Sequence, residues 1–232
     1  MKRLYAQVDT AAVVGGHQVR LDGRPLKTPR QRPLVAPTAA LAERVAGEWA
    51  AQGETVDVDG MRVSRLATTA VDLMPERRAD ALAQVVDYVA TDLLCYRATH
   101  PPELAELQAR HWDPPLAWLA ATHALRLEVT TAMTPLPPPA EAVAGVRRLV
   151  DELADWPLVG LHALTTATGS VVLALMVQAG ALGGAAAAEA ALVDERFERA
   201  RWGDEADALA REARLIADVA AAERFLAALA RS

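Results

Sequence analysis

The sequence predicts an α+β protein in which a small antiparallel sheet comes first and a larger set of helices follows. Apolar and polar residues alternate over much of residues 4–21, as they do in strands with one buried face. Beyond Met61 the apolar residues recur at helical spacing almost to the end. A chain of 232 residues suits one large or two small domains. We therefore expect an N-terminal sheet-containing domain over 1–75 and a helical domain over 76–232.

The sheet is expected within residues 1–36. Residues 13–17 contain a Gly-Gly pair that predicts a turn, and Asp22-Gly23 is a typical hairpin pair. Prolines at 25, 29 and 33 divide the remaining segments into short pieces that belong at sheet edges. Val56 and Val58 alternate with polar residues, which predicts one further strand.

The first helix is expected to begin at Pro37-Thr38, with Thr38 as its N-cap, and to end before Gly53. Leu41, Val45 and Trp49 are spaced four residues apart and therefore share one face. Because a tryptophan at this spacing usually packs inside, we expect Trp49 in the core.

The later helices are predicted from apolar stripes and from breaking residues. A helix is expected around 82–93, ended by Pro101-Pro102, and Pro114-Pro115 is expected to divide the next helical stretch in two. Prolines at 135 and 137–139 predict a loop. Further helices are expected over about 140–153, 157–182 and 185–230, the last of them broken near Trp202-Gly203.

One long segment carries no charge. No charged residue lies between Asp155 and Glu189, which is long enough to span a bilayer. Its threonine, glycine and alanine content favours instead a buried central helix of a helical domain. We therefore expect no membrane insertion.

Charge and cysteine content narrow the functional classes. The net charge of −6 conceals a balance of +5 over residues 1–36. These cations alternate with apolar residues, and Tyr5 is the only aromatic residue before Trp49, which favours a solvated face over a nucleic-acid site. Cys95 is the only cysteine, so no intramolecular disulfide can form. With no secretory signal evident at residues 1–8, we expect a cytoplasmic protein.

No motif predicts catalysis. The chain has neither a phosphate-binding glycine loop nor a G-x-S-x-G elbow. Cys95, His100 and His111 match no zinc spacing, and Cys95 beside two leucines favours a small core residue. We expect no cofactor, no metal and no enzymatic activity. An enzyme that uses Cys95 or a carboxylate site is the alternative.

An acidic stretch offers a candidate binding surface. Asp194, Glu195 and Glu198 precede Trp202-Gly203. Acidic residues beside an aromatic anchor suit the docking of a basic partner. The alternative is structural, since acidic residues after Gly203 favour the dipole of the following helix.

Several short runs occur in an order and spacing that resemble one family. The chain resembles the ATP synthase assembly chaperones that handle the alpha subunit of the catalytic head, the ATP-twelve family. The resemblance covers about residues 4–228. The runs that carry it are Leu21-Asp22-Gly23-Arg24-Pro25-Leu26-Lys27-Thr28-Pro29, Glu48-Trp49-Ala50-Ala51-Gln52, Thr91-Asp92-Leu93-Leu94-Cys95-Tyr96-Arg97-Ala98, Trp112-Asp113-Pro114, Thr168-Gly169-Ser170, and Asp194-Glu195 with Trp202-Gly203.

The resemblance implies a function, a fold and a site. Members are not enzymes; they bind the newly made alpha subunit until beta joins, and their C-terminal domain consists of orthogonal helices. The resemblance implies partner-binding roles for Asp194, Glu195, Glu198 and Trp202, although members often carry Gln where Glu198 stands. It also implies the alpha subunit as a transient partner, a monomeric chaperone, and bacterial relatives, since mitochondrial members carry a transit peptide.

Overall fold

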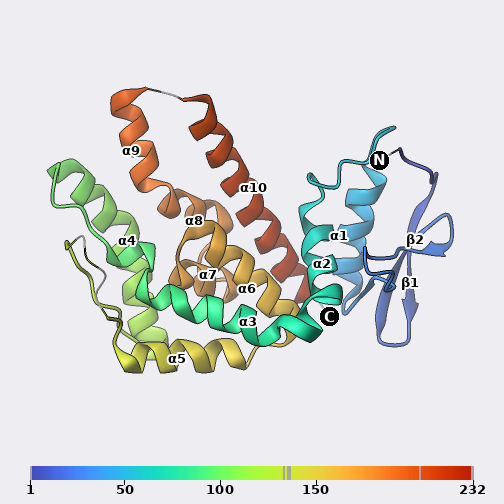
Figure 1. The fold of residues 1–232 in the computed structure, drawn as a ribbon, viewed down its shortest axis with the longest axis horizontal. Coiled ribbons are helices and arrows are strands. Elements are labelled where there is room, and N and C mark those ends of the chain that lie inside the picture. The colour runs from blue at the N-terminus through green and yellow to red at the C-terminus, as the bar shows by residue number, and fades with distance from the viewer. Residues whose placement is uncertain (1, 133, 135–136, 204, 231–232) are drawn as a thin grey trace. The chain divides into compact units, whose positions relative to one another are not determined.

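The computed structural model describes residues 2–132, 134, 137–203 and 205–230, and it confirms the predicted α+β fold (Figure 1). Two short 3-10 helices, η1 and η2, join the α-helices. The elements in chain order are β1 (Val8–Val13), β2 (Gly16–Leu21), β3 (Arg24–Pro25), β4 (Val35–Ala36), α1 (Ala39–Ala50), α2 (Arg62–Asp72), α3 (Met74–Asp87), η1 (Tyr88–Ala90), η2 (Leu93–Cys95), α4 (Pro102–His123), α5 (Ala140–Asp151), α6 (Asp155–Thr168), α7 (Val171–Gln178), α8 (Gly184–Ala191), α9 (Val193–Trp202) and α10 (Ala206–Leu229).

The sheet is antiparallel and is built around β2. Strand β1 pairs with β2 as a hairpin, while the short strands β3 and β4 pair with β2. The structure confirms both predicted turns: Asp22 and Gly23 have φ of 48° and 74°, the left-handed conformation of tight hairpin turns. A Cβ on Gly16 would lie 2.2 Å from the Ala36 carbonyl oxygen, so the approach of β4 requires glycine there.

The predicted strand at Val56 and Val58 is wrong. Thr55 forms only an isolated bridge with Lys2. Beyond it, side chains take the hydrogen bonds that a strand would need: the Asp57 amide donates to Gln52 Oε1 at 2.7 Å, and the Gly60 amide donates to Asp57 Oδ1 at 3.2 Å. The segment therefore turns instead of extending.

Helix α1 packs on β1 and β2. Thr38 is its N-cap as predicted, because its Oγ1 accepts a hydrogen bond from the Leu41 amide at 3.2 Å. Leu41 and Val45 are fully buried, but Trp49 in the last turn is only half-buried, so its placement in the core was wrong.

The chain forms two compact units. The first contains the described residues of 1–79, 154–160 and 221–232, and the second those of 80–153 and 161–220. Segments from late in the sequence complete the first unit: Trp156 stacks on Phe225, and the Thr38 hydroxyl donates to the Ala228 carbonyl at 2.8 Å. The predicted division into domains at residue 75 stays a prediction, since a compact unit is not by itself an independently folding domain.

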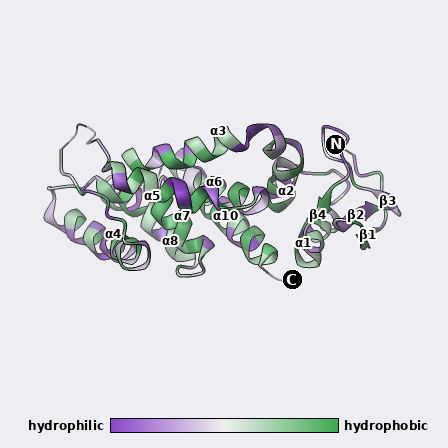
Figure 2. Cartoon of the chain, turned by 90° about the horizontal axis from the view of Figure 1, so that it is seen from below, coloured by the Kyte–Doolittle hydropathy of each residue, from purple (hydrophilic) through white to green (hydrophobic). Residues whose placement is uncertain are grey.

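The second unit surrounds α7. All residues from Val171 to Val177 are buried, as expected of a central helix, and Figure 2 shows hydrophobic residues along the helices of this unit. None of the described helices is long and apolar enough to cross a membrane.

Two predicted helix boundaries in this unit were wrong. The segment 157–182 divides into α6 and α7, because Gly169 has a φ of 68° and the Ser170 hydroxyl accepts from the Leu173 amide as an N-cap. Residues 185–202 likewise form two helices, α8 and α9, that meet at Leu192.

Helix α4 runs unbroken through Pro114-Pro115, which corrects the predicted interruption. Buried side chains on both sides of the prolines hold it: Trp112 donates its indole N–H to the Ala190 carbonyl at 2.8 Å, and Leu119 is fully buried. Tertiary packing here outweighs the loss of two backbone donors. Asp113 is an exposed helical residue whose Oδ1 lies 2.9 Å from Arg97 Nη2.

The Asp92 carboxylate accepts hydrogen bonds from polar groups at the N-terminus of α7. It is fully buried and accepts hydrogen bonds from Ser170 Oγ at 3.0 Å, from the Val172 amide at 3.3 Å and from the Leu94 amide at 3.1 Å. Burial raises the pKa of this carboxyl to about 6.

We expect Asp92→Ala to lower the free energy of unfolding by about 2–4 kcal/mol, because buried donors lose their acceptor. Urea unfolding measures this, and Asp87→Ala, at an exposed position, is the control.

The folded chain binds the Asp92 proton more tightly than the unfolded chain does. We therefore expect the contribution of Asp92 to the free energy of unfolding to fall as pH rises from about 3.8 to 6. Asp92→Asn removes that pH dependence. An unchanged profile would contradict this assignment.

Candidate functional site

Helix α9 carries all four residues predicted to bind a partner. It starts after Leu192 and ends at Gly203, whose φ of 94° stops the helix. Asp194 and Glu195 lie in its first turn, where the helix dipole favours carboxylates.

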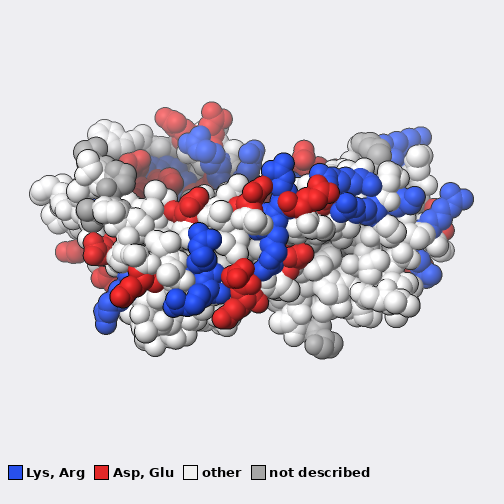
Figure 3. Space-filling model, turned by 60° about the horizontal axis from the view of Figure 1, so that its bottom comes forward, with Lys and Arg blue, Asp and Glu red and all other residues white. Residues whose placement is uncertain are grey.

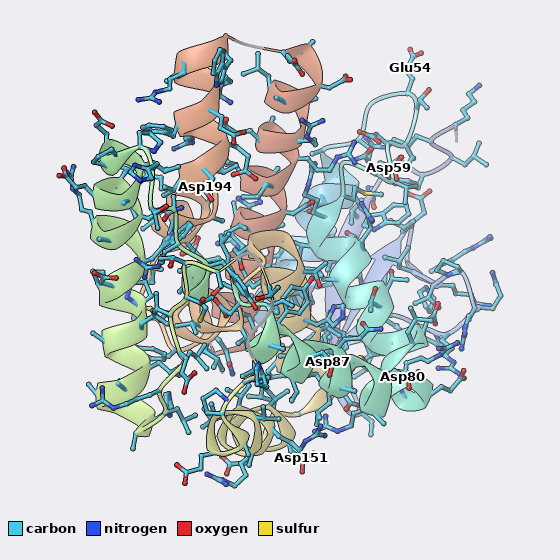
Figure 4. The ribbon with its side chains drawn as sticks, turned by 60° about the vertical axis from the view of Figure 1, so that its left-hand side comes forward. Glu54, Asp59, Asp80, Asp87, Asp151 and Asp194 are labelled. Carbon is cyan, nitrogen blue, oxygen red and sulfur yellow. The ribbon has the colours of Figure 1, made fainter. Side chains whose placement is uncertain are left out.

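Asp194 connects α9 to α4 (Figure 4). Its Oδ1 accepts a hydrogen bond from Gln108 Nε2 at 2.8 Å, and Gln108 Oε1 in turn accepts from the Ala98 amide at 2.8 Å. Because Gln108 is buried and Asp194 is half-buried, this carboxylate positions α9 besides contributing charge.

The other three predicted residues are exposed on one face of α9. Glu195, Glu198 and Trp202 are spaced at i, i+3 and i+7, which places them along a single stripe. Trp202 is 86% exposed. We call Glu195, Glu198 and Trp202 the α9 surface.

The arginines of α9 are engaged within the protein. Arg196 Nη2 lies 2.8 Å from Glu212 Oε1 on α10, and Arg199 pairs with the same carboxylate. These guanidinium groups lower the pKa of Glu212. Neither Glu195 nor Glu198 has an ion-pair partner among the residues the structure describes. The α9 surface therefore presents carboxylates beside an exposed aromatic ring.

Helix α10 adds two apolar residues that the sequence analysis missed. Leu209 and Ile216 share a helix face with Glu212 and are 45% and 39% exposed. Since Glu212 binds the arginines of α9, this face of α10 is turned toward α9. The i, i+7 spacing of two large apolar residues in an alanine- and arginine-rich helix is the sequence feature that could have predicted them.

Comparison with known proteins identifies the family. The ATP12 chaperone protein model matches residues 2–120. The crystal structure of Atp12 from Paracoccus denitrificans has 36% sequence identity and a TM-score of 0.92, and the match covers 98% of each chain. The chain belongs to the ATP12 chaperone family.

Two further solved structures resemble this chain closely. Atu1473 from Agrobacterium tumefaciens, described as a putative chaperone, has 36% identity and a TM-score of 0.93 over 98% of this chain and 86% of its own. An Asp-to-Lys mutant of the Paracoccus protein has 35% identity and a TM-score of 0.91 over 98% of this chain and 97% of its own.

Cys95, weighed above as a nucleophile or metal ligand, is a buried thiol. Cys95 is buried in η2, as predicted for a small core residue, and burial raises the pKa of its thiol to about 12. Within the described part of the chain, no three His, Cys, Asp or Glu residues are placed to hold a metal ion. His162 hydrogen-bonds Gln84 at 2.7 Å.

We expect Asp194→Ala to lower the free energy of unfolding by about 1–2 kcal/mol, because buried Gln108 loses its acceptor. Glu195→Ala, at the next position, should change stability by less than about 0.5 kcal/mol. Chemical denaturation of both variants measures the difference. Equal values would show that Asp194 does not hold α9 in place.

We expect Cys95 to resist alkylation by iodoacetamide at pH 8 in the folded protein and to react quickly in urea, because a buried thiol of high pKa supplies almost no thiolate. Mass spectrometry of the carbamidomethylated chain measures both rates. Fast alkylation of the folded protein would restore Cys95 as a candidate nucleophile.

Proposed function

We propose that this protein is an assembly chaperone of the ATP synthase catalytic head, that it binds the unassembled alpha subunit, and that the α9 surface is its docking site. Membership of the ATP12 chaperone family supports the first part, and the ordered motifs of the sequence support the client. The observation that carries the docking site is Trp202, which is 86% exposed and shares a helix face with Glu195 and Glu198, two carboxylates without an ion-pair partner among the described residues.

The chemistry of the α9 surface suits a protein client. Tryptophans that are exposed in the free protein and become buried on binding are frequent anchors of protein interfaces, where a few residues supply most of the binding energy. The carboxylates of Glu195 and Glu198 attract a basic surface and speed the encounter. Leu209 and Ile216 are further exposed apolar residues, on α10.

The task of such a chaperone requires binding alone. An unassembled subunit exposes apolar surface that aggregates unless it is covered. A chaperone that covers it stabilises the free subunit by mass action, and a tighter-binding neighbour subunit displaces it without a nucleotide cycle. The cytoplasmic location and the monomeric state stay predictions.

The test is a binding titration of the purified chain with isolated alpha subunit by biolayer interferometry. We expect Trp202→Ala to weaken binding by about tenfold or more, as loss of an interface anchor does. Glu195→Lys with Glu198→Lys should slow association, most clearly at low salt. The unfolding midpoint of Trp202→Ala should stay at the wild-type value, because this side chain is exposed. The double charge reversal should lower the midpoint slightly, because Glu195 lies in the first turn of α9, where the helix dipole favours a carboxylate.

Two variants at other exposed sites serve as controls. Glu141→Lys on α5 repeats the charge reversal, and Leu4→Ala removes another exposed apolar side chain. Wild-type binding by the α9 variants would show that the client docks elsewhere. Failure of the wild-type chain to bind alpha would overturn the proposed client.

A further inference from the structure

The sheet-bearing unit contains a cavity of about 640 Å³ that the α9 surface does not involve. The loop of residues 26–34, the end of α1 and one face of α2 enclose it. Leu34, Trp49 and Met61 form apolar walls, and Thr68 contributes a hydroxyl. The volume lies within the range of pockets that bind small ligands.

The walls of this cavity are held in place before any ligand arrives. Buried Asp72 accepts a hydrogen bond from the Thr28 hydroxyl at 2.7 Å and from the Arg30 amide at 3.1 Å, which fixes the loop against α2. Glu48 accepts from the Val63 and Ser64 amides at the start of α2. These two carboxylates are therefore already occupied.

The Trp49 ring is held firmly in the cavity wall. Its indole Nε1 is buried and has no partner within the described residues. The Tyr5 ring packs against it with 5.8 Å between centroids, and the Tyr5 hydroxyl donates to the Trp49 carbonyl at 2.7 Å. These contacts hold the Trp49 ring as part of the cavity wall, so its indole N–H signal reports binding in the cavity.

The charge of the cavity is positive. Lys27 and Arg65 line it, both are exposed, and neither has an ion-pair partner in the described ranges. Among the described residues that line it, none is acidic. Nearby Arg30 and Arg32 differ, since both pair with Glu76. Figure 3 shows Lys and Arg side chains gathered over this unit, consistent with the basic balance of residues 1–36.

We propose that this cavity binds a short extended peptide segment in which an acidic side chain neighbours an apolar one. The apolar side chain packs between Leu34, Trp49 and Met61. Acidic side chains of the peptide pair with Lys27 and Arg65. A fatty acid offers a single carboxylate, whereas an extended peptide with alternating acidic and apolar side chains offers a carboxylate to each cation and apolar groups to the walls.

The test is an NMR titration of the ¹⁵N-labelled chain, which has five tryptophans and therefore five indole N–H signals. Trp49→Phe identifies the Trp49 signal. The probes are acetyl-Leu-Glu-Leu-Glu-amide, acetyl-Leu-Lys-Leu-Lys-amide and octanoate. We expect the Glu peptide alone to shift the Trp49 signal saturably. Lys27→Glu or Arg65→Glu should weaken that binding about fivefold or more, since each reverses a charge on the cavity wall.

Arg24→Glu is the matched control, because Arg24 is exposed in the same unit but does not line the cavity. It should bind the Glu peptide as the wild type does. No shift with the Glu peptide, equal binding of the Lys peptide, or equal binding by octanoate would each overturn the proposal. The titration needs no alpha subunit, so its failure is distinguishable from failure of the proposed function. Conversely, a chain that binds the Glu peptide but not the alpha subunit would overturn only the proposed function.

Discussion

The second unit depends on one constraint: α7 is buried along its apolar length, so the backbone N–H groups at its start must be satisfied by the protein itself. Ser170 and Asp92 do this, and the same carboxylate accepts from the Leu94 amide and so fixes η2. The chain that follows η2 presents the Ala98 amide to Gln108. Gln108 then donates to Asp194 at the start of α9. Two groups of hydrogen bonds, joined by the short chain segment from Leu94 to Ala98, thus link the central helix to the candidate client surface.

Some charged side chains of α9 form contacts within the protein, and others face solvent. Arg196 and Arg199 are engaged by Glu212 of α10, and Asp194 is engaged by Gln108. Glu195, Glu198 and Trp202 form no ion pair among the described residues, and they lie along one stripe. The contacts that hold α9 in the fold involve Asp194, Arg196 and Arg199. Substitutions at exposed residues on another face of the helix can therefore change the affinity for a partner with little loss of stability.

Local chemistry allowed much of the fold to be predicted, and long-range packing explains what was missed. Thr38, Asp22 and Gly23 act through neighbours in sequence, so the cap and the hairpin turn could be inferred. The break at Gly169 lies in an apolar run that has helical spacing on both sides, and α4 continues through Pro114 because distant partners hold it. The exposure of Trp49 depends on a cavity formed by three separate segments. The acidic stretch before Trp202 was visible in the sequence, and the resemblance implied its partner-binding role. The structural contact of Asp194 with Gln108 required the fold.

Hydrogen exchange measured by mass spectrometry, with and without isolated alpha subunit, tests the central claim most directly. The account predicts that alpha slows exchange in peptides covering Glu195–Trp202 and the exposed stretch of α10 near Leu209, with little change in β1 and β2. Slowed exchange confined to the sheet, with none in α9 or α10, would contradict the assignment of the client surface.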